Sequence, residues 1–588
     1  MNKQEPLTIE ELEAQMESAF QEGEATDLAL FLWEAIGRFP EKASIARIYL
    51  KKVLRNPDIA ALSLEDFKKN AKRLREGNEP EESAKHAALG LLLFPKDRYL
   101  SLSIVDAAEK LKRDEWLAPA IEPLGQPKPD DVVLQNAIAA LAQKTGDYEK
   151  SYRIFSRLNA REPENEQFIQ SLSAALVGLS RWDEAKTMLE KMLPVTQEPK
   201  AYLHRLTPIY SNLGLDVEKS LETLDEEFFK ACSTAKIARA HADIRMFLQD
   251  FPGVIEGLQA EYQFKPSPEV AFEIAEAEFT AERFDSALER YGVRFEAFPK
   301  LDWGRRDLPP YRGEILTEET LYVWGEQGIG DEILFSFFFE ELERRVRHVT
   351  VAMDARLIPS YQARYPNWRF IDRLTASGEM TNADFVCPSG DLMVLFLEEL
   401  VAKNAAFQWP LIQPTPRRLE IVHGLMPPKS RPRVAISWRG GTKTNGLIRS
   451  MELDDFVNGI PADADVDLIS LQYDEGHEEE VKAFGDRRIA LSGLNNRLDI
   501  DGVLSLMKCC DAVLTVDNAV AHFGAAVGVP TYVILPAGQT QFRWKSPSLK
   551  RLVFPKVNTF IQNKPGSWSG VVKTVWGQLL SDLQGDDG

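Results

Sequence analysis

The first half of the chain repeats a helical pattern about every 34 residues. A polar turn precedes an aromatic residue, and a small residue follows three positions later, as in Tyr148 with Ser151 and Trp182 with Ala185. The register of small residues extends in both directions, through Ala84, Ala118, Ser151, Ala185, Ser220 and Ala287. The interval between the last two is about twice the period, so we expect one degenerate unit between them.

A period of this length, made of paired helices, resembles the tetratricopeptide repeat family. The likeness covers roughly residues 20–300 and is clearest in 132–199, so we assign residues 1–300 to an α-helical solenoid, with an irregular cap before residue 70. The small residue lets two helices approach closely, and the aromatic residue packs against the neighbouring unit. Prolines at Pro95, Pro163 and Pro299 stand where helices must end. Such arrays usually bind a peptide or protein segment, although an array can also only space or dimerise a chain.

From Thr320 onward, short apolar runs alternate with amphipathic helical stretches. We predict strands at 320–324, 348–353, 368–372 and 383–387, and, after a proline-rich segment, at 433–438, 466–472, 488–491, 512–516 and 530–535. Two consecutive series of this kind predict two Rossmann-like parallel-sheet domains that face each other across a cleft. The predicted boundaries are 315–410 for the first domain, 411–432 for a linker, and 433–588 for the second domain.

The first candidate site is a glycine-rich turn between the strand at 320–324 and an apolar helical stretch. Gly325, Gly328 and Gly330 lie within six residues, and Asp331 falls in the first turn of the predicted helix. Glycines of this density let a backbone come close to a ligand, and the carboxylate of Asp331 would lie beside that ligand. Turn glycines with an acidic helix cap are also common without any ligand.

The second candidate site follows the buried-looking strand at 512–516. Asp517 suits the N-cap of a helix rich in small residues, and Asn518 and His522 lie four apart on one face of that helix. The open N-terminus of such a helix can receive a phosphate or ribose hydroxyls. A histidine on a helix can equally be structural.

Charge and composition exclude several classes of protein. The chain has 70 Lys and Arg against 90 Asp and Glu, a net charge of −20, which disfavours nonspecific nucleic-acid binding. The N-terminal residues are acidic and lack an apolar core, so no secretory signal is expected. No apolar stretch approaches the ~18 residues that span a bilayer. Four cysteines without metal-type spacing suit a reducing cytoplasm.

Two segments resemble family-nine, heptosyltransferase-like glycosyltransferases of the GT-B fold, closest to the subgroup with N-terminal tetratricopeptide repeats. They are 309–336 (PPYRGEILTEETLYVWGEQGIGDEILFS) and 511–530 (DAVLTVDNAVAHFGAAVGVP). Shorter supporting motifs are Ser437 to Gly441, Arg449-Ser450 and Ser470 to Gln472, and the likeness covers about 305–545. The fold class implied is a helical solenoid followed by a two-domain α/β GT-B fold.

The resemblance assigns roles to particular residues. It makes Asp331 the catalytic base, Arg449 a contact to the donor phosphates, and Asp517 with His522 the holders of the nucleotide sugar. Asn518 stands where threonine is common, which could alter the donor contacts. Further candidate substrate contacts are Glu326, Gln327, Gly330, Arg439, Gly440, Ser450 and Gln472. Of these, Glu326, Gln327 and Gln472 could equally stabilise their own turns.

No metal or cofactor is expected, because a base and a set of cations suffice for sugar transfer and the nucleotide sugar is a co-substrate. The sequence Asp463-Ala464-Asp465 matches a metal-binding D-x-D pattern, which we interpret as a coincidence in a surface loop. The glycine spacing is G-x-x-G-x-G rather than the dinucleotide fingerprint, which disfavours a nicotinamide or flavin enzyme.

The expected function is transfer of a sugar to a hydroxyl, with the repeats recruiting a protein whose Ser or Thr side chain is the acceptor. Flagellin is a candidate acceptor by analogy with bacterial proteins of similar layout. Two alternatives stay open. One is a transferase acting on a lipopolysaccharide or polysaccharide glycan, and the other is a non-catalytic adaptor with a nucleotide-binding domain.

Overall fold

The computed structural model describes most of the chain. The described residues are 9–22, 25–39, 62–111, 113–125, 127–128, 130–229, 233–301, 308–375, 383–405, 410–440, 449–461, 464–474, 476–485, 489–539, 542–562 and 568–585. No helix among them is long and apolar enough to cross a membrane.

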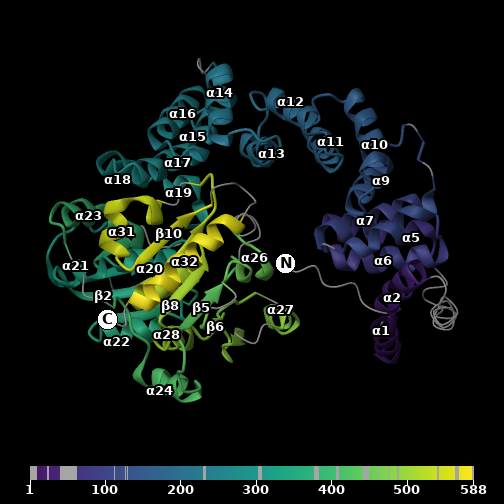
Figure 1. Cartoon of the computed structure of the whole chain (residues 1–588). Coiled ribbons are helices and arrows are strands. Elements are labelled where there is room, and N and C mark those ends of the chain that lie inside the picture. The colour runs from purple at the N-terminus through teal and green to yellow at the C-terminus, as the bar shows by residue number, and fades with distance from the viewer. Residues whose placement is uncertain are drawn as a thin grey trace. The chain divides into compact units, whose positions relative to one another are not determined.

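Successive helices fill the first half (Figure 1). They are α1 (Ile9–Glu22), α2 (Ala25–Arg38), α5 (Leu64–Glu76), α6 (Pro80–Leu93), α7 (Arg98–Leu111), η2 (Asp114–Trp116), α8 (Leu117–Ile121), η3 (Glu122–Leu124), α9 (Val132–Lys144), α10 (Tyr148–Arg161), α11 (Glu166–Gly178), α12 (Trp182–Met192), α13 (Pro199–Asn212), α14 (Val217–Phe229), α15 (Ala235–Phe247), α16 (Phe251–Phe264), α17 (Pro268–Thr280), α18 (Phe284–Tyr291), α19 (Arg294–Ala297) and η4 (Pro299–Leu301).

The predicted register of small residues falls on the second helix of each pair. Ala84, Ser151, Ala185 and Ala287 are fully buried in α6, α10, α12 and α18, whereas Ala118 in α8 and Ser220 in α14 are half-buried. The degenerate unit predicted between 220 and 287 is the pair α15 and α16, where Val254 is fully buried one period after Ser220. The helical period is therefore confirmed.

The aromatic residue of one unit packs against the next, as predicted. Tyr148 begins α10, and a Cβ added to Gly178 at the end of α11 would lie 2.3 Å from the Tyr148 ring. Gly178 therefore leaves the space that the tyrosine ring occupies.

The chain separates into two compact units, Met1–Lys191 and Met192–Gly588. The sequence-based boundary at residue 300 separates helical from sheet-forming residues, whereas compactness divides the repeats themselves. The later repeats, from α13 to α19, belong to the same unit as the sheets.

The first sheet has four parallel strands in the order β3-β2-β1-β4. The strands are β1 (Leu316–Trp324), β2 (Val346–Met353), β3 (Arg369–Asp372) and β4 (Phe385–Pro388), and the helices are α20 (Ile329–Ser336), α21 (Phe339–Glu343), α22 (Ile358–Arg364) and α23 (Ser389–Ala402). The chain moves outward from β1 to β3 and then returns to β4 on the other side of β1. The strand order reverses between β1 and β4, which is where parallel sheets bind ligands.

The second sheet has six parallel strands in the order β10-β9-β8-β5-β6-β7. Its strands are β5 (Arg433–Ser437), β6 (Asp467–Ser470), β7 (Ile489–Leu491), β8 (Ala512–Val516), β9 (Thr531–Leu535) and β10 (Val557–Ile561). Its helices are α26 (Leu453–Val457), α27 (His477–Phe484), α28 (Ile500–Lys508), α29 (Ala519–Ala526), α30 (Phe542–Lys545), α31 (Pro547–Val553) and α32 (Ser569–Gly585). Here the order reverses between β5 and β8.

All nine predicted strands form, and the fold class is confirmed. The tenth strand, β10, was not predicted, because an edge strand with only its first residue buried lacks a continuous apolar run. The segment predicted as a linker contains a helix, α24 (Pro416–Leu425). It is anchored to the second sheet domain by Thr415, whose backbone N–H donates to Asp501 over 2.8 Å, and by an Arg418–Asp499 ion pair.

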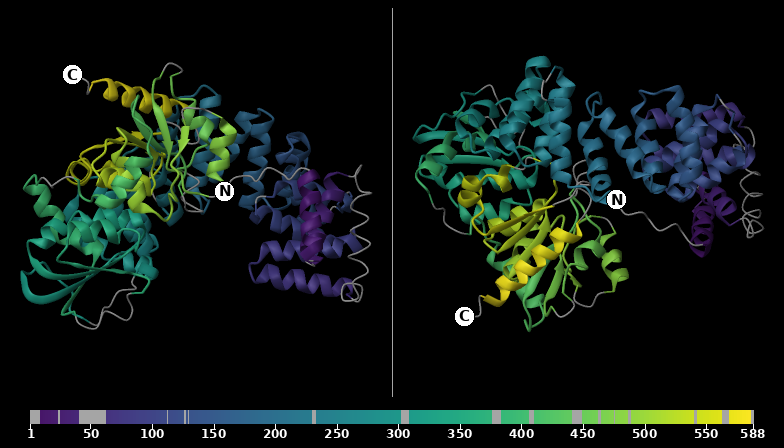
Figure 2. Two further views of the ribbon diagram at one scale, coloured as in Figure 1. Left: turned by 90° about the horizontal axis from the view of Figure 1, so that it is seen from below. Right: turned by 45° about the horizontal axis from the view of Figure 1, so that its top comes forward.

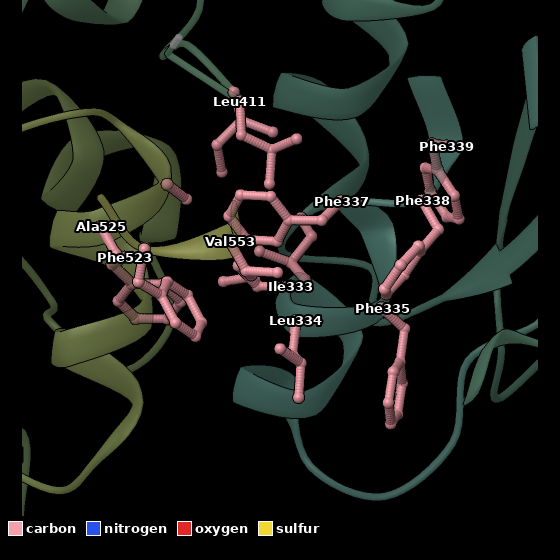
Figure 3. Close-up of a cluster of buried hydrophobic side chains, with 14 of the residues drawn as sticks. Ile333, Leu334, Phe335, Phe337, Phe338, Phe339, Leu411, Phe523, Ala525 and Val553 are labelled. Carbon is pink, nitrogen blue, oxygen red and sulfur yellow. The ribbon is translucent and has the colours of Figure 1, made fainter. Parts of the chain in front are cut away.

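Side chains from both sheet domains share one core. Ile333 and Phe337 point from the first domain toward Val553 of the second, whereas Phe335 and Phe339 point away from it (Figure 3). The ring of Phe337 meets that of Phe554 edge-on, with centroids 5.3 Å apart. On the second sheet, α32 crosses one face (Figure 2) and buries an apolar stripe there.

Candidate functional site

The glycine-rich turn connects β1 to α20, at the reversal point of the first sheet. Asp331 is the third residue of α20, and its Oδ2 accepts a hydrogen bond from the backbone N–H of Gly328 over 3.1 Å. Its Oδ1 lies 2.7 Å from a guanidinium nitrogen of Arg543, which belongs to α30 of the second domain. The predicted base is therefore ion-paired across the two sheet domains.

Two of the glycines leave space for other parts of the protein. A Cβ on Gly325 would lie 2.4 Å from the Glu332 carboxylate, and one on Gly330 would lie 2.8 Å from the His522 ring. Gly330 therefore lets α20 approach α29 closely enough for the histidine ring to fit between them. The sequence predicted that a ligand would approach the backbone at these glycines. In the structure, the group that lies against Gly330 is the side chain of His522 from the second sheet domain.

Glu326 is fully buried and supports the turn. Its carboxylate receives hydrogen bonds from Arg294 at 2.6 and 2.9 Å and from the backbone N–H of Gly390 at 2.7 Å. Arg294 is also fully buried and comes from α19 of the repeat region. These contacts stabilise the turn, which is one of the two roles that the sequence left open for Glu326, and a substrate contact stays a prediction.

Gln327 follows with a left-handed backbone, φ 62°. Its side-chain amide donates to the hydroxyl of Tyr291 in α18 at 3.5 Å, and its carbonyl accepts from Arg373 at 3.3 Å. The turn is thus held from one side by the last complete repeat and from the other by its own domain.

In the second sheet, two amides fill the reversal point. The side-chain oxygen of Gln472 accepts from the backbone N–H groups of Trp438 and Arg439 at 3.0 and 3.1 Å, and Gln472 is fully buried. The Asn518 amide donates to Ser437 Oγ at 2.9 Å and to the Arg439 carbonyl at 3.0 Å. The side chain of Gln472, which follows β6, therefore stabilises the neighbouring loop after β5.

The cap of α29 differs from the prediction. Asn518, not Asp517, is the N-cap, and its side chain accepts from the backbone N–H of Val520 at 2.9 Å. The physical reason is that the Asp517 carboxylate has other partners. It lies 2.9 Å from Arg449 and accepts from the indole N–H of Trp544 at 2.7 Å.

Asp517 stays charged although it is buried. Burial raises the pKa of its carboxyl, but Arg449 and Arg543 lower it more strongly, so the pKa lies below the ordinary value. Arg449 in turn is about one-quarter exposed, with 23% of its side-chain surface accessible. A cation here can therefore meet a ligand at the reversal point.

Arg439 has its charge neutralised within its own domain. It is buried between Asp474, at 2.9 Å, and Glu480, at 2.7 Å. The neighbouring Gly440 donates its backbone N–H to Ser450 Oγ at 3.0 Å. These contacts shape the loop after β5, and Gly441, also predicted in this motif, lies outside the described residues.

His522 is packed between the two domains. It is 3% exposed, and its ring lies 4.8 Å from that of Trp544 and 5.6 Å from that of Phe554. Burial, reinforced by Arg543, lowers its pKa to about 4, so the imidazole is neutral at neutral pH. Its Nδ1 is buried and has no hydrogen-bond partner among the described residues.

Arg543 was missed by the sequence analysis, yet it lies at the centre of the cluster. It contacts Asp331 directly and interacts electrostatically with Asp517 and with Glu276 of the repeat helix α17. A usable signal was present: an arginine between two aromatic residues, Phe542 and Trp544, shortly after a buried strand. Loops at the carboxyl ends of parallel strands are where such residues meet ligands.

The structure therefore brings Asp331, Arg543, Asp517, Arg449 and His522 together where the two domains meet. The side chains of Glu326, Arg439 and Gln472 instead bind neighbouring groups of the protein. Asp463 of the D-x-D pattern lies outside the described residues, whereas Asp465 pairs with Arg431 at 3.0 Å. Within the described ranges, no group of three or more His, Cys, Asp or Glu side chains is placed to hold a metal.

No family model matches the chain. Protein FlbA of Caulobacter vibrioides is 24% identical over 545 residues, a match that covers 86% of this chain and 88% of FlbA. The E. coli ADP-heptose LPS heptosyltransferase II matches 45% of this chain and 99% of its own, with 14% identity and a TM-score of 0.34. The Thermobaculum terrenum O-GlcNAc transferase matches 78% of this chain and 93% of its own, with 13% identity and a TM-score of 0.26.

TM-scores this low carry no argument about the fold, so the fold assignment rests on this chain's own strands and helices. Helix pairs at a period of about 34 residues precede two parallel sheets. In each sheet the strand order reverses once, and a helix begins beside that point. The chain combines helical repeats of the tetratricopeptide type with a two-domain α/β region of the GT-B type.

Proposed function

We propose that this protein is a metal-independent glycosyltransferase that moves a sugar from a nucleotide-sugar donor to an acceptor hydroxyl. One observation carries the proposal: the Asp331 carboxylate on one sheet domain contacts Arg543 of the other domain, where a second guanidinium group, that of Arg449, pairs with Asp517. A base facing cations at the ends of two parallel sheets suits a reaction in which a hydroxyl loses a proton and a diphosphate departs.

The acceptor oxygen attacks the anomeric carbon of the donor sugar and forms the new C–O bond, while its proton passes to Asp331. The bond between the anomeric carbon and the phosphate oxygen breaks, and its electron pair leaves with the nucleoside diphosphate. Arg449 and Arg543 offset the charge that develops on the leaving group.

His522 and Asn518 would serve the donor rather than the reaction itself. The neutral imidazole of His522 has an unpartnered nitrogen and can exchange a hydrogen bond with a ribose or sugar hydroxyl. Asn518 holds the loop after β5 against the N-terminus of α29. Both residues lie at the reversal point between β5 and β8, where nucleotides bind in folds of this kind.

The acceptor in this proposal is a Ser or Thr hydroxyl of a protein that the helical repeats recruit. Helix-pair arrays bind extended protein segments on their surface, which supports a polypeptide acceptor. Flagellin is the first candidate by analogy of layout alone. A lipopolysaccharide or polysaccharide glycan is the alternative acceptor, and a non-catalytic nucleotide-binding adaptor is the alternative to an enzyme.

The Asp331→Asn variant tests the base. With a panel of UDP-, GDP-, dTDP- and ADP-sugars, we expect turnover to fall by about 10²- to 10⁴-fold while donor affinity persists. Asp455→Asn, an exposed aspartate on α26, is the matched control and should behave as wild type. Undiminished turnover in Asp331→Asn would remove the base assignment, and donor binding without any turnover by wild type would favour the adaptor.

Removal of residues 1–191, the first compact unit, tests recruitment. We expect hydrolysis of the donor sugar by water to persist and transfer to the protein acceptor to weaken through a higher KM. Mass spectrometry of proteins from cells with and without this chain identifies that acceptor. If the shortened protein modifies the acceptor at the full rate, these repeats do not recruit it.

A further inference from the structure

The repeat region places a carboxylate of its own at the proposed site. Glu276 lies on α17, three residues before Phe279, whose ring stacks on that of Phe542 with centroids 5.1 Å apart. Phe272 lies four residues before Glu276 on the same helix face and contacts the ring of Tyr291. The hydroxyl of Tyr291 accepts a hydrogen bond from the side-chain amide of Gln327. Glu276 therefore lies between the contact of α17 with α30 and its contact with Tyr291 of α18.

Glu276 has no compensating partner of its own. Among the described residues its carboxylate makes no hydrogen bond or ion pair, whereas Glu273, one turn earlier, binds Arg239. The charged groups that face it are Arg543 on α30, Asp331 on α20, Lys200 on α13 and Glu273 on its own helix. Of the cations named here, Arg543 acts on Glu276 most strongly.

Three carboxylates act on one guanidinium group at this junction. Asp331, Asp517 and Glu276 all interact with Arg543, and lysine side chains on α13 and α30 add further positive charge nearby. Asp331 and Asp517 each contact an arginine directly, whereas Glu276 contacts none in the described part of the chain. The negative charge of an entering diphosphate raises the pKa of nearby carboxyl groups, and Glu276 is the one of these three without a described ion-pair partner to oppose that rise.

We propose that Glu276, supplied by repeat helix α17, is a positioning residue of the transfer site that acts through Arg543 and takes up a proton as a nucleoside diphosphate enters. This inference rests on the proposed function. With Glu276 neutral, one carboxylate fewer competes with the diphosphate for the guanidinium of Arg543. When that guanidinium turns to the phosphates, the Asp331 carboxylate can face the acceptor hydroxyl.

The electrostatics of the resting site agree with this role. Burial raises the pKa of Glu276 to about 7, and the nearby Glu273 and Asp331 carboxylates add to the rise against the opposing effect of Arg543. A group with such a pKa is poised to change its charge near neutral pH when the surrounding charge changes. Asp517, by contrast, is held ionised by its two arginines.

The test is calorimetric titration of the full-length protein with UDP, GDP, ADP and dTDP, followed by study of whichever binds. Titration in two buffers of different ionisation enthalpy gives the number of protons taken up on binding, from pH 6 to pH 8.5. We expect wild type to take up more protons than Glu276→Gln at the same pH, because the ligand's own protonation is common to both. Wild-type affinity should also fall by up to about tenfold per pH unit, relative to the variant, above pH 7.

Two further variants separate positioning from folding. Glu269→Gln removes an exposed carboxylate from the first turn of the same helix and should match wild type. Glu276→Asp keeps a carboxyl group and should retain the proton uptake. Equal uptake in wild type and Glu276→Gln would overturn the inference alone, as would an equal loss of affinity at every pH. Failure of wild type to bind any of the four nucleotides would overturn the proposed donor site and this inference with it.

Discussion

Each of the two sheets has one point where the strand order reverses, and the side chains that fill this point differ between the sheets. In the first, the reversal point between β1 and β4 is filled by a buried ion pair, with Glu326 bound to Arg294 and to the N-terminus of α23. In the second, the reversal point between β5 and β8 is filled by neutral amides, Gln472 and Asn518, with cations at its edge. In the first sheet the charged groups at the reversal point are buried and paired with each other. In the second sheet the arginines lie at the edge of the reversal point, where a ligand can reach them.

This difference supports the proposed donor side on physical grounds. An anion that entered the first reversal point would meet a buried carboxylate that already occupies the helix N-terminus. An anion at the second would meet Arg449 and Arg543, whose partners are carboxylates that it can displace. The first domain is therefore suited to present a base, and the second to receive phosphates.

Breaking the charged reversal point should have the largest effect. Arg294→Met leaves the Glu326 carboxylate buried without its cation, which we expect to cost about 3–5 kcal/mol of unfolding free energy. Urea unfolding followed by fluorescence and circular dichroism measures this cost. Arg344→Met is the control, because Arg344 is 58% exposed and its pairs with Glu340 and Glu341 should contribute about 0–1 kcal/mol. Equal effects of the two variants would mean that the buried pair does not hold the turn.

The neutral reversal point should instead be sensitive to acid. The pKa of His522 is about 4 in the folded protein against 6.5 for a free side chain, so the unfolded state binds more protons between those values. Stability is therefore lost as pH falls from 6.5 toward 4, by about 3 kcal/mol from this residue. His522→Gln should reduce the slope of unfolding free energy against pH in that window.

His204 on α13 also has a pKa lowered to about 4, through burial and Lys200, so part of the slope should persist in His522→Gln. His348, which is exposed on β2, provides the control: His348→Gln should leave the slope unchanged. An unaltered slope in His522→Gln would show that the imidazole is not buried as a neutral group.

Separating the two reversal points should have the smallest effect on stability and a clear one on transfer. A Cβ at Gly330 would meet the His522 ring at 2.8 Å, so Gly330→Ala must push α20 and α29 apart, at about 1–3 kcal/mol. Gly328→Ala meets nothing closer than 3.5 Å and should cost far less. Comparison of the two variants in thermal unfolding and in donor turnover tests whether close contact of the domains is required. Full turnover in Gly330→Ala would mean that it is not.

Local patterns in the sequence were enough to predict the architecture. Buried small residues such as Ala84 and Ala185 recur because each repeat needs one close helix contact, and buried strands are continuous apolar runs. β10 lacked such a run and was missed. Asp517 and Asn518 are both good caps, and only the Arg449 and Trp544 contacts, made through the tertiary fold, decide between them.

The candidate site was predicted in part, because some of its contacts join distant segments. Asp331, Asp517 and His522 follow strands directly, so a rule about strand ends finds them. Arg294 and Glu326 are 32 residues apart and belong to different architectural parts, so no local signal pairs them. Glu276 looks like an ordinary helix glutamate until α30 is packed against α17. The catalytic role of Asp331 stays a prediction.

The Arg294–Glu326 pair also bears on how such a protein can evolve. A recombination event that exchanged the repeats near residue 300 would separate the two partners and leave one charge buried alone. An exchange near residue 191 would carry both partners together. An exchange near residue 191 should therefore cost less stability than one near residue 300, because only the second leaves a buried charge without its partner.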